Sequence, residues 1–554
     1  MEQLIVLSDC ENRFLVNHLK KQFEDTSLEV LGGGYNQIEQ YIYDSQKPIC
    51  EYMVLLFSPQ VMYERYMSLG RAERAYLADD YLQRIKTIWD RLAQLHVKCI
   101  VQFSMAELPE NVWGNYAVQE KTSFTFQVRR FNQLLAEESQ GKDSLRILDL
   151  QQIQLSMGNK DFFDTRMYYL ARFPFSMKAV CAIGKNMQAI ISSFSGKQKK
   201  AVVCDLDGLL WGGAIGENGL DGILLGEYGE GAIFKDIQRW LKCLKDRGIL
   251  LAYCSKNAPE NAALPFQQHP DMVLQLQDFV ERRAGWNNKS EELLHIGKVL
   301  NLRTDSFVFL DDSPLERAEI KARLPEVTVP EMPEDPLEYL AYLRQLCLFE
   351  SGPITETDLR RSEQYCQETS RNSARELYTD YNSFLKALKL QMVLSEWSEG
   401  WFDRISQLNR RTNQFNLNNT RLSSDDVRRI SVEGPDTSMC ASLEDCYGTY
   451  GLCGGAAWEY ADKVLQVNSF FLSCRVFKRG VEEFLLDQLL RTAEKHGCEK
   501  VSFQYENTGK NQYLMDFLQN NGAYFNSAGK PEILLAKYQY HETFITLRNV
   551  QNGK

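Results

Sequence analysis

Several features that would assign the chain to a particular class are missing from its 554 residues. The 14 cysteines form no Cys-x-x-Cys pair and no Cys/His cluster at zinc spacing, which argues against structural zinc and predicts reduced thiols. Nowhere do about eighteen apolar residues run together, and the opening MEQLIVLSDCENRF has no basic segment before a long apolar one. We therefore expect a cytoplasmic protein that is neither secreted nor membrane-spanning.

Positive charge is also in deficit. The 63 Lys and Arg residues against 74 Asp and Glu give a formal net charge of −11, which argues against a general nucleic-acid or anionic-membrane binder. Small phosphorylated substrates remain possible. Hydrophobic content of 44% and charged content of 25% are those of a globular protein, and the length predicts roughly three or four domains.

Residues 1–165 alternate short apolar runs with longer amphipathic segments, which is typical of an open parallel α/β sheet. The runs are LIVLSD, LEVLGGG, YMVLLFSP, VKCIVQFS and LRILDL. The layout resembles an SGNH-hydrolase-like domain, but the Gly-x-Asn-Asp and Asp-x-x-His motifs are absent. Ser8 without its base is a weak nucleophile, so we expect a structural or docking role. Residues 166–199 are predicted to form a helical linker.

A second α/β block is predicted over residues 200–349, and its first strand ends in two acids. In AVVCDLDGLLWGG, Asp205 and Asp207 follow a buried apolar run, and strand alternation predicts that their side chains point to the same side. Two close carboxylates repel unless a cation neutralises them. The pair therefore predicts a divalent metal with oxygen ligands, most simply Mg²⁺.

Three later segments complete a set of polar groups in chain order. GILLAYCSKN ends near Ser255, WNNKSEEL contains Lys289, and SFVFLDDSPLERAEI carries Asp311 and Asp312. Together with Asp205 they resemble the four signature motifs of the haloacid dehalogenase (HAD) superfamily. The alternative is that these acids are helix caps or surface carboxylates.

The HAD resemblance implies a role for each residue. Asp205 would be the nucleophile that forms an aspartyl-phosphate, and Asp207 the acid/base that also lends its carbonyl to Mg²⁺. Asp311 and Asp312 would be further metal ligands, while Ser255 and Lys289 would hold the phosphoryl group. The family usually has Thr or Val where this chain has Leu209. The interval after Trp211 has room for a glycine-rich hairpin but no cap domain, which favours a carrier-bound or protein substrate.

Residues 355–554 contain a different pattern of short strands and helices. The segment VNSFFLSCRVFKRGVEEF would deliver Arg475, Lys478, Arg479 and Gly480 to a helix start, where backbone amides bind phosphate groups. With Asn511 in ENTGKNQYLMDF, this resembles the GCN5-related N-acetyltransferase (GNAT) fold. The resemblance implies a site for a phosphopantetheine arm.

Two cysteines are candidate thiol nucleophiles. Cys474 directly precedes the basic turn, where cationic side chains and a helix start would lower the pKa of its thiol. The alternative is a buried strand cysteine. Cys254 adjoins Ser255 and is a second choice, because alternation turns it away from the phosphoryl site.

The order of these segments predicts a multidomain α/β protein: a doubly wound SGNH-like sheet, a HAD-like Rossmannoid domain without a large cap and a GNAT-like α+β domain. With DLDGLLWGGAIGENGLDGI, CSKN, LDDSPLER, TNQFNL, SCRV and RGVE, it resembles the FkbH-type proteins of polyketide biosynthesis. Members of that family dephosphorylate 1,3-bisphosphoglycerate and pass its glyceryl group through an enzyme cysteine to the phosphopantetheine of an acyl carrier protein. DLDGLLW replaces the usual Asp-Leu-Asp-Asn-Thr-Leu-Trp, and GTYG replaces Gly-Asp-x-Gly. A plain Mg²⁺-dependent phosphatase and a non-enzymatic carrier-docking scaffold are the alternatives.

Overall fold

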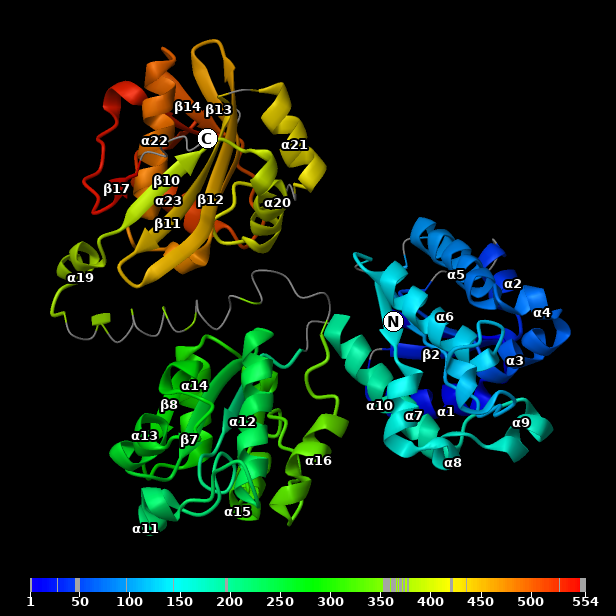
Figure 1. Cartoon of the computed structure of the whole chain (residues 1–554). Coiled ribbons are helices and arrows are strands. Elements are labelled where there is room, and N and C mark those ends of the chain that lie inside the picture. Colours follow the sequence, from blue (N-terminus) through cyan, green and yellow to red (C-terminus); the bar gives the residue numbers. More distant parts are fainter. Residues whose placement is uncertain are drawn as a thin grey trace. The chain divides into compact units, whose positions relative to one another are not determined.

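The chain is described here by a computed structural model. It covers residues 2–26, 28–44, 50–95, 97–142, 144–194, 198–351, 359, 365, 367, 371, 374–375, 378–418, 422–434, 436–527 and 529–548. The chain divides into two compact units, Met1–Ser362 and Glu363–Lys554 (Figure 1). None of the described helices is both long and apolar enough to span a membrane. Residues 195–197 of the predicted linker lie outside the described residues, and the predicted domain boundaries stay predictions.

The first sheet contains five parallel strands in the order β2-β1-β3-β4-β5. They are β1 (Glu2–Ser8), β2 (Leu28–Tyr35), β3 (Tyr52–Leu56), β4 (Cys99–Phe103) and β5 (Leu145–Leu148). The accompanying helices are α1 (Arg13–Gln22), α2 (Ile38–Tyr43), α3 (Pro59–Ser68), α4 (Arg71–Arg74), α5 (Leu77–Gln94), α6 (Phe124–Ser139), α7 (Leu150–Met157), α8 (Asn159–Phe162), α9 (Thr165–Ala171) and α10 (Met177–Phe194). This strand order is typical of a doubly wound sheet, the predicted fold class, and each predicted apolar run supplies one strand.

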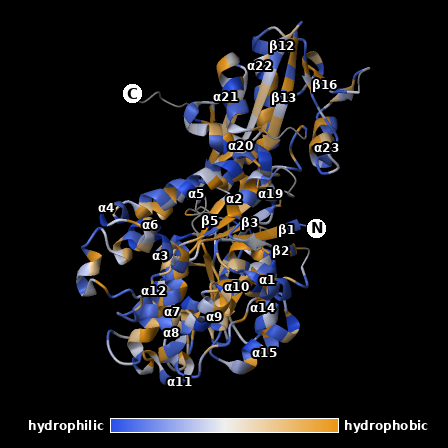
Figure 2. Ribbon diagram, turned by 90° about the vertical axis from the view of Figure 1, so that its right-hand side faces the viewer, coloured by the Kyte–Doolittle hydropathy of each residue, from blue (hydrophilic) through white to orange (hydrophobic). Residues whose placement is uncertain are grey.

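Both faces of this sheet are covered, because alternate residues of β1 enter different apolar cores. Leu4 and Val6 pack with α1 and α10, whereas Ile5 and Leu7 pack with α5 and α6. Figure 2 shows these strands largely in the hydrophobic colour, whereas the helices carry both hydrophilic and hydrophobic colours. Helix α10 lies within residues 166–199, which were predicted to be a helical linker. Its apolar stripe from Ala179 through Ile190 is buried in the first core.

The second sheet has four parallel strands in the order β8-β7-β6-β9. The strands are β6 (Ala201–Cys204), β7 (Leu250–Ser255), β8 (Phe279–Ala284) and β9 (Phe307–Leu310). Its helices are α11 (Ile215–Asn218), α12 (Gly231–Asp246), α13 (Pro259–Gln268), α14 (Lys289–Val299), α15 (Pro314–Arg323) and α16 (Tyr339–Gln345). Because the strands are parallel, their carboxyl ends meet at one edge of the sheet.

The second unit is built on an eight-stranded mixed sheet in the order β15-β16-β14-β13-β12-β11-β10-β17. The strands are β10 (Gln391–Ser395), β11 (Ser438–Asp445), β12 (Gly448–Ala461), β13 (Val464–Leu472), β14 (Lys500–Phe503), β15 (Tyr524–Phe525), β16 (Pro531–Leu534) and β17 (Thr546–Leu547). The helices are α19 (Tyr381–Leu388), α20 (Phe402–Arg411), α21 (Ser424–Glu433), α22 (Val481–Lys495) and α23 (Gln512–Asn520). Helices α22 and α23 pack in one apolar core, and α20 and α21 in another (Figure 1). The α+β architecture matches the expectation.

Candidate active site

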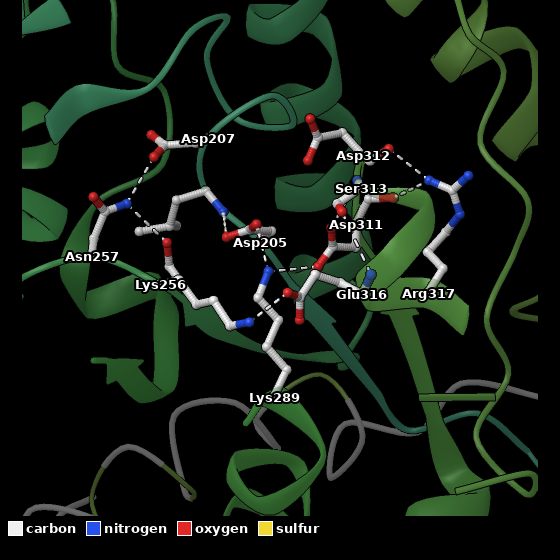
Figure 3. A network of polar contacts seen from close by, with 12 residues as sticks. Asp205, Asp207, Lys256, Asn257, Lys289, Asp311, Asp312, Ser313, Glu316 and Arg317 are labelled. Carbon is white, nitrogen blue, oxygen red and sulfur yellow. Dashed lines mark hydrogen bonds and ion pairs between the residues drawn. The ribbon is translucent and has the colours of Figure 1, made fainter. Parts of the chain in front are cut away.

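The polar residues predicted from the second block meet at the carboxyl edge of its sheet. Asp205 directly follows β6, Ser255 is the last residue of β7, and Asp311 directly follows β9. Lys289 begins α14, which follows β8. Figure 3 shows the side chains of Asp205, Lys289 and Asp311 converging from these separate elements.

Lys289 connects the two aspartates that directly follow β6 and β9. Its Nζ lies 2.6 Å from Oδ2 of Asp205 and 2.6 Å from Oδ2 of Asp311 (Figure 3), and its side chain is only 2% exposed. Burial alone would lower the pKa of this ammonium group, but the charges of Asp205 and Asp311 outweigh burial and raise it. Lys289 is therefore held as a cation.

Three carboxylates form a group with the chemistry of a divalent-metal site. One oxygen each from Asp205, Asp311 and Asp312 lie within 4.8 Å of one another. Burial, reinforced by the charge of Asp205, raises the pKa of Asp311 to about 6 and also raises that of Asp312. Such a cluster of oxygen donors, costly to ionise together without a cation, fits Mg²⁺.

Asp207 is held apart from this group. Its Oδ1 accepts hydrogen bonds from Nε1 of Trp211 at 2.7 Å and from the backbone N–H of Ile215 at 3.1 Å, while Oδ2 accepts from Nδ2 of Asn257 at 2.8 Å. The prediction that Asp205 and Asp207 point to the same side assumed a continuing strand. Strand β6 ends at Cys204, so alternation no longer applies, and the Asp207 carboxylate is outside the three-carboxylate group.

The turn after Asp207 depends on a glycine. Gly208 has φ +69°, and a Cβ there would lie 2.1 Å from Oδ2 of Asp312. The Asp312 carboxylate thus occupies space that only a residue without a side chain leaves open. Arg317 fixes the other side of this segment, because its Nη1 donates to the carbonyl oxygens of Asp311 and Asp312 at 2.9 and 2.7 Å.

The site has no large cap within the continuously described residues 198–351. The insertion after β6 contains only α11 and a short turn of 3₁₀ helix, joined by hydrogen bonds between Gly212 and Leu224. A cavity of about 480 Å³ lies beside the site, with Asp312 and Arg317 on one wall and Phe234 and Tyr339 among its apolar lining. The site can therefore receive a substrate larger than phosphate.

Four polar residues of the site were not singled out from the sequence. Trp211 and Asn257 orient Asp207, and Asn257 also donates to Oγ of Ser255 at 3.1 Å. Lys256 and Glu316 form an ion pair of 2.6 Å. The quoted motifs DLDGLLW, CSKN and LDDSPLER contain all four residues, but their partners lie 2 to 60 positions away.

In the second unit, the structure brings together three segments quoted from the sequence, which are TNQFNL, VNSFFLSCRVFKRGVEEF and ENTGKNQYLMDF. The backbone N–H of Leu472 at the end of β13 donates to the carbonyl of Phe415, and Nδ2 of Asn511 donates to the carbonyl of Asn416. Asn511 is buried, and its amide also donates to Glu506 while its oxygen accepts from two further groups. Its side chain thus makes hydrogen bonds within the protein, and the predicted cofactor contact of Asn511 stays a prediction.

Cys474 lies just beyond β13 and is exposed, so it is not a buried strand cysteine. Lys478 and Gly480 both adopt positive φ, of 62° and 78°, and Gly480 precedes the first turn of α22. Arg479 donates to the carbonyl of Arg475, which closes the basic turn. The predicted turn onto a helix start is therefore present next to an accessible thiol.

Cys254 has the opposite environment. Cys254 is 2% exposed, and burial raises the pKa of its thiol to about 12. A thiol that is buried and protonated lacks the thiolate that nucleophilic attack requires. We do not retain it as an acyl carrier.

Ser8 is the last residue of β1 and Asp9 follows it, at the carboxyl edge of the first sheet. The Ser8 hydroxyl is buried, donates to the carbonyl of Cys10 and accepts from Nδ2 of Asn12. Oδ1 of Asp9 accepts from the backbone N–H of Ser58 at 2.8 Å, and burial raises the pKa of Asp9 to about 7. The expected structural or docking role of this domain stays a prediction.

Comparison with known proteins relates both parts of the first unit to described proteins. The family model of the FkbH N-terminal domain matches residues 3–192. The crystal structure of the N-terminal part of protein BF1531 from Bacteroides fragilis, which contains a phosphatase domain and was solved with Mg, is 33% identical. The match covers 63% of this chain and 94% of that chain, with a TM-score of 0.60.

Two acetyltransferase structures match more weakly, and no curated protein matches the sequence. Spermidine N-acetyltransferase from Vibrio cholerae, solved with CoA and spermine, is 14% identical over 27% of this chain and 98% of its own, with a TM-score of 0.22. A putative acetyltransferase from Salmonella typhimurium, solved with acetyl-CoA, is 12% identical over 26% and 95%, with a TM-score of 0.21. Residues 3–192 belong to the family defined by the FkbH N-terminal domain, and the chain joins that domain to a region similar to a Mg-bound phosphatase domain.

Proposed function

We propose that the first unit is a Mg²⁺-dependent phosphatase of phosphate esters and acyl phosphates. The observation that carries this proposal is the group of three carboxylates bridged by the buried Lys289. An ordinary surface cluster of acids needs no buried lysine at its centre, whereas phosphoryl transfer needs both a nucleophile and fixed positive charge.

In the proposed reaction, a carboxylate oxygen of Asp205 attacks phosphorus, the phosphorus–oxygen bond to the leaving group breaks, and the leaving oxygen takes a proton from Asp207. Asp207 then accepts a proton from water, whose oxygen attacks the same phosphorus and releases inorganic phosphate from Asp205. Bound Mg²⁺ would be held by Asp205, Asp311 and Asp312, with the carbonyl of Asp207 as a further ligand, and would neutralise charge on the phosphoryl group. Ser255 and Lys289 would hold the remaining phosphoryl oxygens.

The test is release of inorganic phosphate with Mg²⁺, by the wild-type protein and by Asp205→Asn. We expect Asp205→Asn to lose at least about 10³-fold in rate, because the covalent path is lost. Asp236→Asn, an exposed aspartate of α12, is the matched control and should keep the wild-type rate. Equal rates for wild type and Asp205→Asn would refute the assignment.

We further propose that the second unit transfers the glyceryl group of 1,3-bisphosphoglycerate to the phosphopantetheine thiol of an acyl carrier protein. The Cys474 thiolate would attack the acyl carbon and the bond from that carbon to the phosphate oxygen would break, which leaves a 3-phosphoglyceryl thioester. The phosphatase centre of the first unit would hydrolyse the remaining phosphate ester with water and release inorganic phosphate. The carrier thiol would then displace Cys474 from the glyceryl thioester and give up its proton, so that Cys474 is regenerated. Arg475, Lys478, Arg479 and the amides at the start of α22 would bind the phosphate of the arm. The exposed thiol beside this basic turn supports the proposal.

Intact mass measurement tests the transfer. After mixing with 1,3-bisphosphoglycerate and a holo acyl carrier protein, a glyceryl increment is expected on the wild-type protein and on the carrier, and on neither with Cys474→Ala. Cys446→Ala, which removes another exposed thiol of the same unit, should behave as wild type. Phosphate release with no increment would favour a plain phosphatase acting on a small or carrier-bound phosphate ester.

A further inference from the structure

The cavity beside the candidate site carries acids that the proposed phosphatase chemistry does not use. It has a volume of about 480 Å³ and adjoins the site through Asp312, which belongs to the three-carboxylate group, and through Gly208, which follows Asp207. Because Asp207 would give its proton to the leaving oxygen, a leaving group held next to this turn would lie within the cavity. The wall of the cavity therefore bears on which leaving groups the site accepts.

Three carboxylates line this cavity in addition to the aspartate of the metal site, and they come from two segments. Glu230 directly precedes α12. Glu334 and Asp335 lie between Pro333 and Pro336, in the segment that leads to α16. Since proline fixes its own φ, this segment holds its two acids on the wall with little backbone freedom.

The protein does not neutralise these acids with its own cations. Glu230 and Glu334 are exposed, and within residues 198–351 neither forms an ion pair. Asp335 accepts from a backbone N–H and, within the same residues, has no cationic partner. Among the described residues that line the cavity the one cation is Arg317, whose guanidinium is engaged by two backbone carbonyls and a glutamate (Figure 3). Negative charge on the wall thus remains unbalanced.

Much of the remaining wall is apolar. Leu224, Phe234, Met332 and Tyr339 line it, and the last three are buried. A charge beside apolar walls is screened less than a charge in open water, so the acids act more strongly on a group inside the cavity. Such a cavity attracts a leaving group with a positive charge, accepts an uncharged one and repels a negative one.

We propose that this cavity is a leaving-group subsite that selects by charge, so that the preferred substrates of the phosphatase centre are phosphate monoesters of amino alcohols. The ammonium group of the alcohol lies beside Glu230 and Glu334, and esters whose leaving group carries a carboxylate are disfavoured. This inference rests on the proposed phosphatase function and specifies its substrate class.

The experiment compares three alkyl phosphates at neutral pH with Mg²⁺. Phosphoethanolamine carries an ammonium group, ethyl phosphate has an uncharged leaving group, and phosphoglycolate carries a carboxylate. The readouts are the kcat/KM values for phosphate release from phosphoethanolamine and from phosphoglycolate, each divided by the value for ethyl phosphate, which cancels effects common to every ester. The test variant is Glu230→Gln/Glu334→Gln. The matched control is Glu24→Gln/Asp25→Asn, which removes two exposed charges of the same unit that do not line the cavity.

We expect the phosphoethanolamine ratio to fall and the phosphoglycolate ratio to rise in the test variant, each by about tenfold, because two nearby charges of the wall are removed. A general loss of folding or of catalysis would not move the two ratios in opposite directions. The control should leave both ratios unchanged. Ratios that stay constant in the test variant, that move in the same direction, or that move equally in the control overturn the subsite.

Failure of the phosphatase proposal would be recognised separately, because the wild type would then hydrolyse none of the three esters. Calorimetric titration with phosphoethanolamine and phosphoglycolate in Mg²⁺ then tests the subsite without turnover. Tighter binding of phosphoethanolamine that is lost in the test variant supports the subsite. Equal binding of the two esters by the wild type, or a preference that the test variant keeps, overturns it.

Discussion

The buried carboxyl group of Asp9 makes the first unit measurably sensitive to pH. Asp9 is 1% exposed, its Oδ1 accepts one backbone hydrogen bond, and within the described residues its Oδ2 has no partner. Burial raises its pKa from 3.8 to about 7. Asp9→Asn removes the titration while keeping an oxygen to accept from the backbone N–H of Ser58.

The sign and size of the effect follow from the shift in the pKa. Because the folded-state pKa is raised, the protonated acid contributes stability that is fully present below about pH 4 and is lost as pH rises through about 7. A shift of about 3 units corresponds to a loss of about 4 kcal/mol, of which about 2–3 kcal/mol falls between pH 5 and pH 8. The asparagine amide adds a cost that does not vary over this pH range.

Chemical denaturation of the full chain at pH 5 and pH 8, followed by far-UV circular dichroism, measures this difference. The free energy of unfolding of Asp9→Asn, relative to wild type, should increase by about 2–3 kcal/mol from pH 5 to pH 8. Asp25→Asn, an exposed aspartate of the same unit, is the control and should show no such change. A constant difference between Asp9→Asn and wild type would refute the assignment of a buried acid that titrates near neutrality.

Two further predictions concern the candidate active site. Gly208→Ala should weaken Mg²⁺ binding, measured by calorimetry, by about 10- to 100-fold, because its Cβ displaces the Asp312 carboxylate. Gly219 has a similar positive φ, of 67°, but no atom of the described residues lies within 4 Å of an added Cβ there, so Gly219→Ala should keep the affinity. Equal affinities in both variants would contradict the account. Asn257→Ala releases Asp207, so kcat/KM for an alkyl phosphate should fall by about tenfold or more, and less for para-nitrophenyl phosphate, whose leaving group needs no proton. An equal fall for both esters would indicate a purely structural role for Asn257.

The strands and the edge at which the polar groups meet could be predicted from the sequence. Asp205 and Asp311 each follow an uninterrupted apolar run, and parallel strands bring such ends together. The basic turn before α22 was also predictable, because Gly480 and the preceding strand form a local pattern. Local periodicity thus indicated which elements deliver the chemistry.

Side-chain partners across long sequence separations were not predictable in the same way. Alternation implied that Asp207 would join Asp205, but β6 ends first and Asn257, 50 positions away, orients Asp207. Similarly, the sequence did not indicate that Asn511 donates a hydrogen bond to the carbonyl of Asn416, because the two residues are 95 positions apart. Such partners depend on tertiary packing, for which a single sequence carries no periodic signal.

The most direct test of the phosphatase proposal is to locate the transferred phosphoryl group. The protein would be mixed with Mg²⁺ and a phosphate ester that it hydrolyses, quenched in acid and digested, and its peptides weighed. The account predicts a phosphate increment on the peptide that contains Asp205, absent in Asp205→Asn and absent when Mg²⁺ is chelated. Phosphate release by wild type without that increment, and undiminished in Asp205→Asn, would contradict it.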